Sequence, residues 1–123
     1  MVKKEKIKKE IIEYKDAVYV GETKNGKFHG KGEFTVTKIK ELDEKDELNT
    51  VLEMEEYKGE FKNGLLDGKG IITYVNGCTF EGRFKKGLKH GKGILKDPLG
   101  NVFIDTTMNI PLEGEWYEDE FIG

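Results

Sequence analysis

A glycine ladder constrains this chain more than any other feature of its sequence. Glycines recur in three sets with the same internal steps of five, four and two residues, and the second and third sets lie 23 residues apart. A period of this length is typical of stacked repeat architectures. Twelve of the 16 glycines belong to this one repeated unit, which favours a scaffold over an enzyme. The ladder consists of Gly21, Gly26, Gly30, Gly32, Gly59, Gly64, Gly68, Gly70, Gly82, Gly87, Gly91 and Gly93.

Each unit reads as two short strands joined by a turn. Tyr57, Gly59 and Phe61 alternate with charged residues, which places them on one face of a strand and the charges on the other. The following Asn63-Gly64 pair predicts a turn, because both residue types tolerate positive φ. A glycine between two aromatic residues also leaves a gap that a ring of a neighbouring strand can fill.

These patterns predict an all-β fold: a single open, twisted antiparallel sheet of consecutive β-hairpins. We expect residues 17–122 to form this sheet. Residues 1–16 are expected to be a separate basic, amphipathic segment, in which Ile7, Ile11, Ile12 and Tyr14 recur at near-helical spacing. The segment is interpreted as a short helix or a solvated tail.

The repeated unit resembles the MORN repeat, whose family pattern is roughly Tyr-x-Gly-x-Phe-x-x-Gly-x-x-His-Gly-x-Gly. Three clear repeats begin near residues 19, 57 and 80, and a degenerate fourth begins near residue 112. In the first, Thr23 replaces the second aromatic residue; in the second, Asp67 stands where the pattern has His. In the fourth, Asp119 occupies the position of the expected glycine.

Two insertions interrupt the repeats, at residues 38–56 and 101–110. The first is interpreted as one hairpin lengthened outward with an acidic tip, and a short helix over residues 41–48 is the competing interpretation. The second is strand-like, and its Pro111 indicates the start of a strand or an edge. The repeat pattern does not determine the phase of this second insertion.

Residue types argue against catalysis. The chain contains no Ser, which excludes serine hydrolases. Cys78 has no partnering histidine evident in the sequence, so we expect a packed or an exposed thiol and no nucleophile. His29 and His90 occupy equivalent repeat positions and are interpreted as part of the repeat, not as a metal pair. The Gly-Lys-Gly segments lack the signature of a phosphate loop. We expect no catalytic residue, metal or cofactor.

Charge and cysteine usage bear on partners and location. The net charge of −3 gives no reason to expect nucleic acid as a partner. Cys78 is the sole cysteine, which suggests a reducing compartment, and no apolar run approaches membrane-spanning length. We expect a cytoplasmic protein, associated with the cytoskeleton or with a membrane, as the family resemblance implies.

Two functions follow from the sequence and the resemblance. The first is a scaffold that holds a helix or an extended segment of a partner protein against the aromatic face, through Tyr57, Phe61, Tyr74, Phe80, Phe84 and Trp116. The second is an adaptor that binds acidic phospholipids through Arg83, Lys85, Lys86, Lys89 and Lys92. Only one of the 21 basic residues is Arg, the better phosphate clamp, so the scaffold is favoured. A homodimer is left open.

Overall fold

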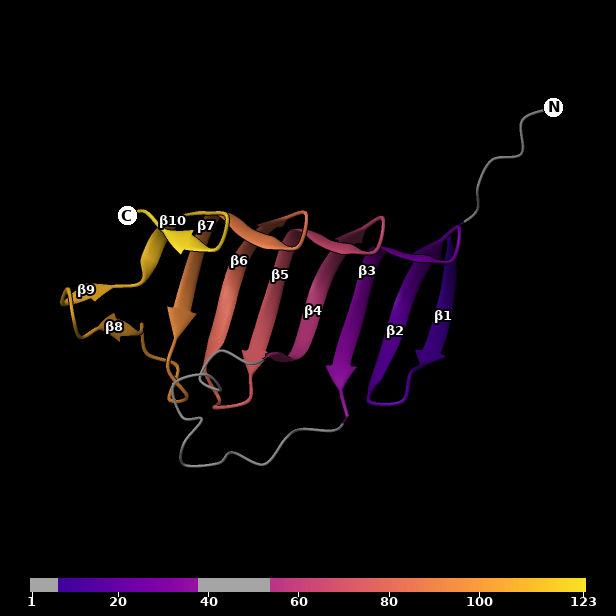
Figure 1. Cartoon of the computed structure of the whole chain (residues 1–123), viewed down its shortest axis with the longest axis horizontal. Helices are drawn as coiled ribbons and strands as arrows, with labels where there is room; N and C mark the ends of the chain where they lie inside the picture. The colour runs from indigo at the N-terminus through magenta and orange to yellow at the C-terminus, as the bar shows by residue number, and fades with distance from the viewer. Residues whose placement is uncertain (1–6, 38–53) are drawn as a thin grey trace.

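The chain forms an open antiparallel sheet of consecutive hairpins, as expected. The structure, a computed structural model, describes residues 7–37 and 54–123. Within these residues there is no helix, and nine strands form one sheet in the order β1-β2-β3-β4-β5-β6-β7-β10-β11 (Figure 1). The strands are β1 (Lys8–Glu13), β2 (Ala17–Lys24), β3 (Lys27–Val36), β4 (Met54–Lys62), β5 (Leu65–Tyr74), β6 (Thr79–Lys85), β7 (Leu88–Lys96), β10 (Glu113–Tyr117) and β11 (Glu120–Phe121).

Four two-residue turns close the hairpins at one end of the strands. Both central residues of each turn have positive φ, the conformation of a type I′ turn, whose twist matches that of the flanking strands. In the fourth turn, Asp119 takes the place of the glycine, with a φ of 71°. The turns are Asn25-Gly26, Asn63-Gly64, Lys86-Gly87 and Glu118-Asp119.

The N-terminal segment is a strand where it is described, not the expected helix or tail. In β1, Lys8, Glu10 and Ile12 alternate with residues of the opposite face, and the strand pairs antiparallel with β2. Ile12 packs against the hydrophobic core. The near-helical spacing of the apolar residues was misleading because β2 offers an unpaired edge, and pairing with it satisfies the backbone of one side of β1.

The two insertions have different outcomes. Residues 38–53 lie outside the described residues, and with them the lengthened hairpin and the competing helix. In the second insertion, β8 (Ile104–Asp105) and β9 (Ile110–Pro111) pair as a separate two-stranded sheet. Pro111 thus lies in an edge strand, as its missing N–H requires. Phe103 packs against the core of the large sheet.

Seven glycines lie opposite one another across seven neighbouring strands, and we call this line the glycine row. It consists of Gly21, Gly32, Gly59, Gly70, Gly82, Gly93 and Gly114. Within each of the first three repeats the strand pairing shifts just beyond the row, between Gly21 and Thr23, Gly59 and Phe61, and Gly82 and Phe84. Such bulges bend strands, and Figure 1 shows the hairpin tips turning over at the upper edge of the sheet.

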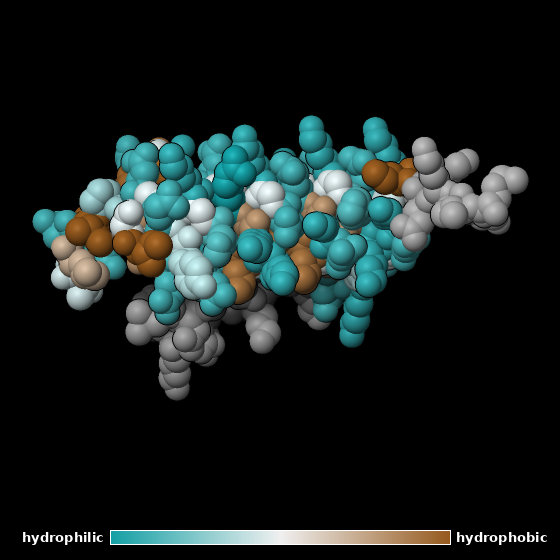
Figure 2. All heavy atoms as spheres, turned by 90° about the horizontal axis from the view of Figure 1, so that it is seen from above, coloured by the Kyte–Doolittle hydropathy of each residue, from teal (hydrophilic) through white to brown (hydrophobic). Residues whose placement is uncertain are grey.

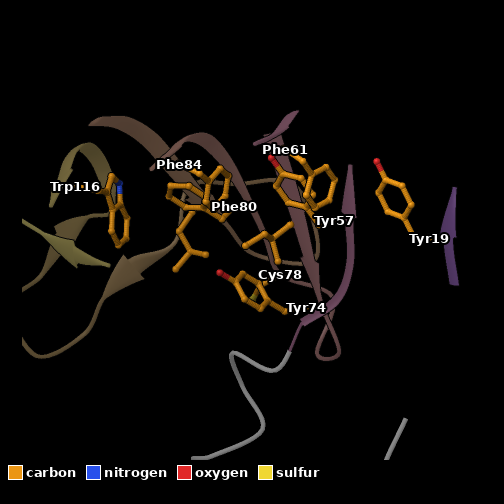
Figure 3. Close-up of a cluster of buried hydrophobic side chains, with 10 residues drawn as sticks. Tyr19, Tyr57, Phe61, Tyr74, Cys78, Phe80, Phe84 and Trp116 are labelled. Carbon is orange, nitrogen blue, oxygen red and sulfur yellow. The ribbon is translucent and has the colours of Figure 1, made fainter. Parts of the chain in front are cut away.

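The core lies in the angle of this bend, where aromatic rings form a continuous line along the sheet (Figure 3). Phe28, near one tip, stacks on Tyr19 with ring centroids 3.8 Å apart. Farther along, Tyr57, Phe61, Phe80, Phe84 and Trp116 contact their neighbours edge to face, at 4.9 to 5.5 Å. Edge-to-face pairs of this kind contribute about 0.5 to 1.5 kcal/mol each beyond burial. Much of each ring's surface is therefore covered by neighbouring rings.

Candidate interaction surfaces

The rings of the aromatic face are held by the glycines of the repeat. A Cβ atom added to Gly70 would lie 2.5 Å from ring carbons of Tyr57, so the ring occupies the space that a side chain would need. The Tyr57 hydroxyl donates a hydrogen bond of 2.8 Å to the carbonyl of Glu60. The same arrangement recurs at Tyr19, whose ring lies over Gly32. The Tyr19 hydroxyl donates a hydrogen bond to the carbonyl of Glu22.

The two glycines of each Gly-x-Gly segment have different roles. The first lies opposite the second aromatic residue of the next repeat: Gly68 opposite Phe84 and Gly91 opposite Trp116. The second belongs to the glycine row and lies beneath an aromatic ring of its own repeat. Contacts between rings of neighbouring repeats, such as Tyr57 with Phe84 and Phe80 with Trp116, link consecutive repeats into one core.

The six aromatic residues predicted to bind a partner are all buried. Their exposed fractions are 7% or less, and Tyr57 and Phe80 have none. Burial raises the pKa of the Tyr57 and Tyr74 hydroxyls well above the usual range. These side chains therefore form the core of the sheet and leave little surface that a partner could contact. The residues are Tyr57, Phe61, Tyr74, Phe80, Phe84 and Trp116.

Of the five basic residues predicted to bind phospholipid, Arg83 lines one hollow with Lys85 and Lys86 and a second with Lys92, whereas Lys89 lies apart from them. Lys85 and Lys86 are exposed at the tip of the β6–β7 hairpin. Lys89 instead turns into the aromatic line, where its Nζ lies 5.2 Å from the centroid of the Phe80 ring and 4.0 Å from Oδ1 of Asp119. Burial lowers the pKa of the Lys89 ammonium.

Arg83 and Lys92, the other two, line a groove that sequence reasoning missed. The groove follows the glycine row on the face opposite the rings, as successive hollows of about 670, 470 and 520 Å³ that share lining residues. Its floor is the backbone of the glycine row, because a side chain at these positions would point to the opposite face, toward the rings. Its walls are the residues on either side of each glycine, which alternation directs away from the core.

The two walls differ in chemistry. The wall nearer the hairpin tips is wholly charged, whereas the other mixes acids and one base with aliphatic residues, of which Val20 and Ile71 are 45% and 41% exposed. The tip-side wall consists of Lys9, Glu22, Lys31, Glu60, Lys69, Arg83, Lys92 and Glu115. The opposite wall consists of Val20, Glu33, Lys58, Ile71, Glu81, Ile94 and Glu113.

Positive charge gathers in the middle of the groove. Lys69 and Arg83 lie directly opposite each other across β5 and β6, and the central hollow that they line also receives Lys58 and Lys92 but only one acid, Glu81. Among the described residues, none forms an ion pair with Lys69, Arg83 or Lys92. Like charges placed opposite each other in a sheet are destabilising.

The residues considered for chemistry occupy structural positions. Cys78 is buried beside the β5–β6 turn, and burial raises the pKa of its thiol. The His90 ring packs on Tyr117, with centroids 5.0 Å apart. Within residues 7–37 and 54–123, no group of three or more His, Cys, Asp or Glu side chains could hold a metal ion. That part of the chain also contains no helix long and apolar enough to cross a membrane.

These features define a class: a repeat protein of stacked β-hairpins, with a self-covering aromatic core on one face and a charged groove on the other. The family model of the MORN repeat matches residues 19–35, 57–79 and 80–102. The chain therefore belongs to the MORN-repeat family. A search of curated proteins finds no match to it.

Proposed function

We propose that this chain is a non-catalytic interaction scaffold whose groove binds an acidic segment of a partner protein, either extended or helical. The observation that carries this proposal is the opposed pair Lys69 and Arg83, which lies in the central hollow without an ion pair among the described residues. Acidic side chains of a bound segment would offset this repulsion. Complementary charge also fixes the register of a bound segment and excludes wrong partners.

The pattern along the groove favours a protein segment over a membrane. The basic centre is flanked by acids on both sides, Glu60 toward the N-terminal strands and Glu115 toward the C-terminal ones. Ile71 adds exposed apolar surface in the basic centre itself. A peptide can match such a sequence of charges and aliphatic contacts residue by residue, whereas an anionic membrane presents uniform charge. Most of the surface seen in Figure 2 is hydrophilic, with apolar atoms confined to small patches.

In this proposal the aromatic residues act indirectly. Rings such as Tyr57 and Phe80 fix the positions of the strands, and through them the spacing of the groove walls. Direct contact between a partner and the aromatic face stays a prediction. Replacing Tyr57 or Trp116 by alanine would primarily measure stability, because each is buried.

The test is selection of ligands from a phage-displayed library of random peptides, with the full chain as bait. We expect the selected peptides to be rich in Asp and Glu interspersed with aliphatic residues. Replacing Lys69 and Arg83 together by Glu should weaken binding of a selected synthetic peptide at least about tenfold. The control is Lys85→Glu with Lys86→Glu, which changes the charge equally at the hairpin tip, beside Arg83 but outside the central hollow, and should weaken binding less.

Sedimentation with vesicles of phosphatidylserine or phosphoinositide tests the competing lipid function. We expect no salt-sensitive binding to vesicles. Strong, salt-sensitive vesicle binding that the Lys85→Glu, Lys86→Glu variant loses would overturn the proposal. Such a result would show that the chain binds an anionic membrane through the lysines of the hairpin tip. Peptides without acidic character, or equal affinity after charge reversal in the groove, would also overturn it.

A further inference from the structure

Among the described residues, β1 pairs with β2 alone and leaves one edge of the nine-stranded sheet unpaired. It is six residues long, whereas β11 at the other edge has two. An unpaired edge presents free backbone N–H and C=O groups to another strand. Ile11, in the middle of β1, is 71% exposed, although its neighbour Ile12 packs on the core.

The register determines which backbone groups of β1 are free. The N–H of Tyr14 donates to the carbonyl of Ala17, 2.8 Å away, so residues 14 and 17 form a hydrogen-bonded pair. Such pairs alternate along an antiparallel ladder. Residues 12, 10 and 8 therefore bond to β2, and Lys9, Ile11 and Glu13 direct their N–H and C=O groups outward.

We propose that two copies of this chain pair antiparallel through β1, about a twofold axis at Ile11. In this register Ile11 of one copy lies opposite Ile11 of the other. Lys9 lies opposite Glu13 of the second copy, and the symmetry repeats this opposite-charge pair on the other side of the axis. All three outward-facing residues of each strand then exchange backbone hydrogen bonds, and the two sheets become one.

Neighbouring registers fit less well. In an antiparallel pair, side chains that lie directly opposite each other point to the same face of the sheet. A twofold axis perpendicular to the sheet keeps every side chain on its own face, so the axis must pass through a residue and not between two. An axis at Glu10 would oppose Glu10 to its own copy and leave Glu13 without a partner in the strand. An axis at Ile12 would bring Lys9 opposite Lys15 of the second copy. Charge complementarity along β1 is thus specific to the axis at Ile11.

Pairing with a second copy also explains the arrangement of the charges on β1. Lysines on a solitary edge strand usually prevent pairing with other chains. Here Lys9 and Glu13 have opposite signs and stand at equal distances on either side of Ile11. The edge therefore matches itself, and repulsion does not oppose the pairing.

Sedimentation equilibrium of the full chain tests this dimer over a concentration series of about 1 to 300 µM, in which mass action makes dimerisation visible. We expect the mass to rise from monomer to dimer. Lys9→Glu alone and Glu13→Lys alone should each weaken the dimer about tenfold, because the symmetry turns two attractive pairs into repulsive ones. The double variant Lys9→Glu, Glu13→Lys restores opposite charges and should dimerise like the wild type.

A backbone variant supplies an independent readout. Ile11→Pro removes an N–H that faces outward and so takes no bond from the ladder to β2, and we expect it to remain folded and monomeric. Far-UV circular dichroism checks the fold of every variant. A wild type that stays monomeric throughout the series would overturn the proposal, as would a dimer that is insensitive to the single charge reversals.

Discussion

At the scale of the residue, glycine is required along the glycine row because neighbouring backbone and aromatic rings lie too close to leave room for a side chain. A Cβ atom on Gly82 would lie 2.6 Å from both Gly93 Cα and the Lys92 carbonyl oxygen, and 3.0 Å from the Phe80 ring. The first two neighbours are backbone, which cannot move without disturbing the adjacent strand. Gly82 has no positive φ, so its role is space and not backbone conformation.

Gly82→Val should lower the free energy of unfolding by at least about 2 kcal/mol, because the added atoms overpack the line of rings and push β6 from β7. Urea denaturation followed by tryptophan fluorescence measures the change. The control is Lys85→Ala at an exposed strand position, which should shift stability by less than about 0.5 kcal/mol. Equal midpoints for Gly82→Val and wild type would refute the packing argument.

At the scale of the element, each hairpin is set by its turn and joined to the next by contacts between tips. The N–H of Gly64 donates to the carbonyl of Phe28 at 2.9 Å, and that of Gly87 donates to Leu66 at 2.8 Å. Asp119 makes the equivalent bond to Lys89, at 3.0 Å. The repeats are therefore coupled at the tips as well as through the sheet, as expected for a stack of nearest neighbours.

The third turn departs from the Asn-Gly sequence of the first two, because Lys86 holds a φ of 51°. Asn adopts this left-handed conformation at lower cost than Lys does. Lys86→Asn should therefore stabilise the protein, by about 0.5 kcal/mol. The bond from the backbone N–H of residue 86 to Asp67 is retained in this variant.

Thermal and urea unfolding would measure this gain, with Lys85→Asn as the control. Residue 85 lies in the strand before the turn, where Asn should be neutral or destabilising. A loss of stability in Lys86→Asn would show that the Lys86 side chain contributes more than the turn geometry costs.

At the scale of the whole molecule, buried tyrosines make the free energy of unfolding depend on pH. Burial raises the pKa of Tyr57 and Tyr74 in the folded state, whereas in the unfolded chain tyrosine titrates near pH 10. Above pH 10 the folded chain therefore holds protons that the unfolded chain has lost. The stabilising contribution of these hydroxyls is complete below pH 10 and is lost as the pH rises toward the folded-state pKa.

We expect the free energy of unfolding to fall above pH 10, by about 1.4 kcal/mol per pH unit for each tyrosine that stays protonated in the fold. Urea denaturation between about pH 8 and 11 measures this slope. Tyr74→Phe should reduce the slope by the share of one tyrosine. Identical slopes for Tyr74→Phe and wild type would mean that the Tyr74 hydroxyl titrates alike in both states.

Much of the architecture was readable from local sequence. Period-two alternation predicted the strands, and Asn25-Gly26 and Asn63-Gly64 predicted the turns, because alternation and positive φ are properties of a few consecutive residues. The degenerate fourth repeat was predicted in the same way. The N-terminal strand was not, because β1 forms only where β2 provides an edge for it.

The sequence by itself determined which residues turn, alternate and repeat, since these depend on local backbone conformation. Only the tertiary structure decided which face of the sheet is buried and which is exposed. Burial depends on neighbours in space, and the bend at the glycine row closes Tyr57 and Trp116 into a core instead of presenting them to a partner. Cross-strand register likewise places Lys69 opposite Arg83 and directs Lys89 into the aromatic line. No local pattern could reveal the groove, because its walls come from residues brought together by seven strands.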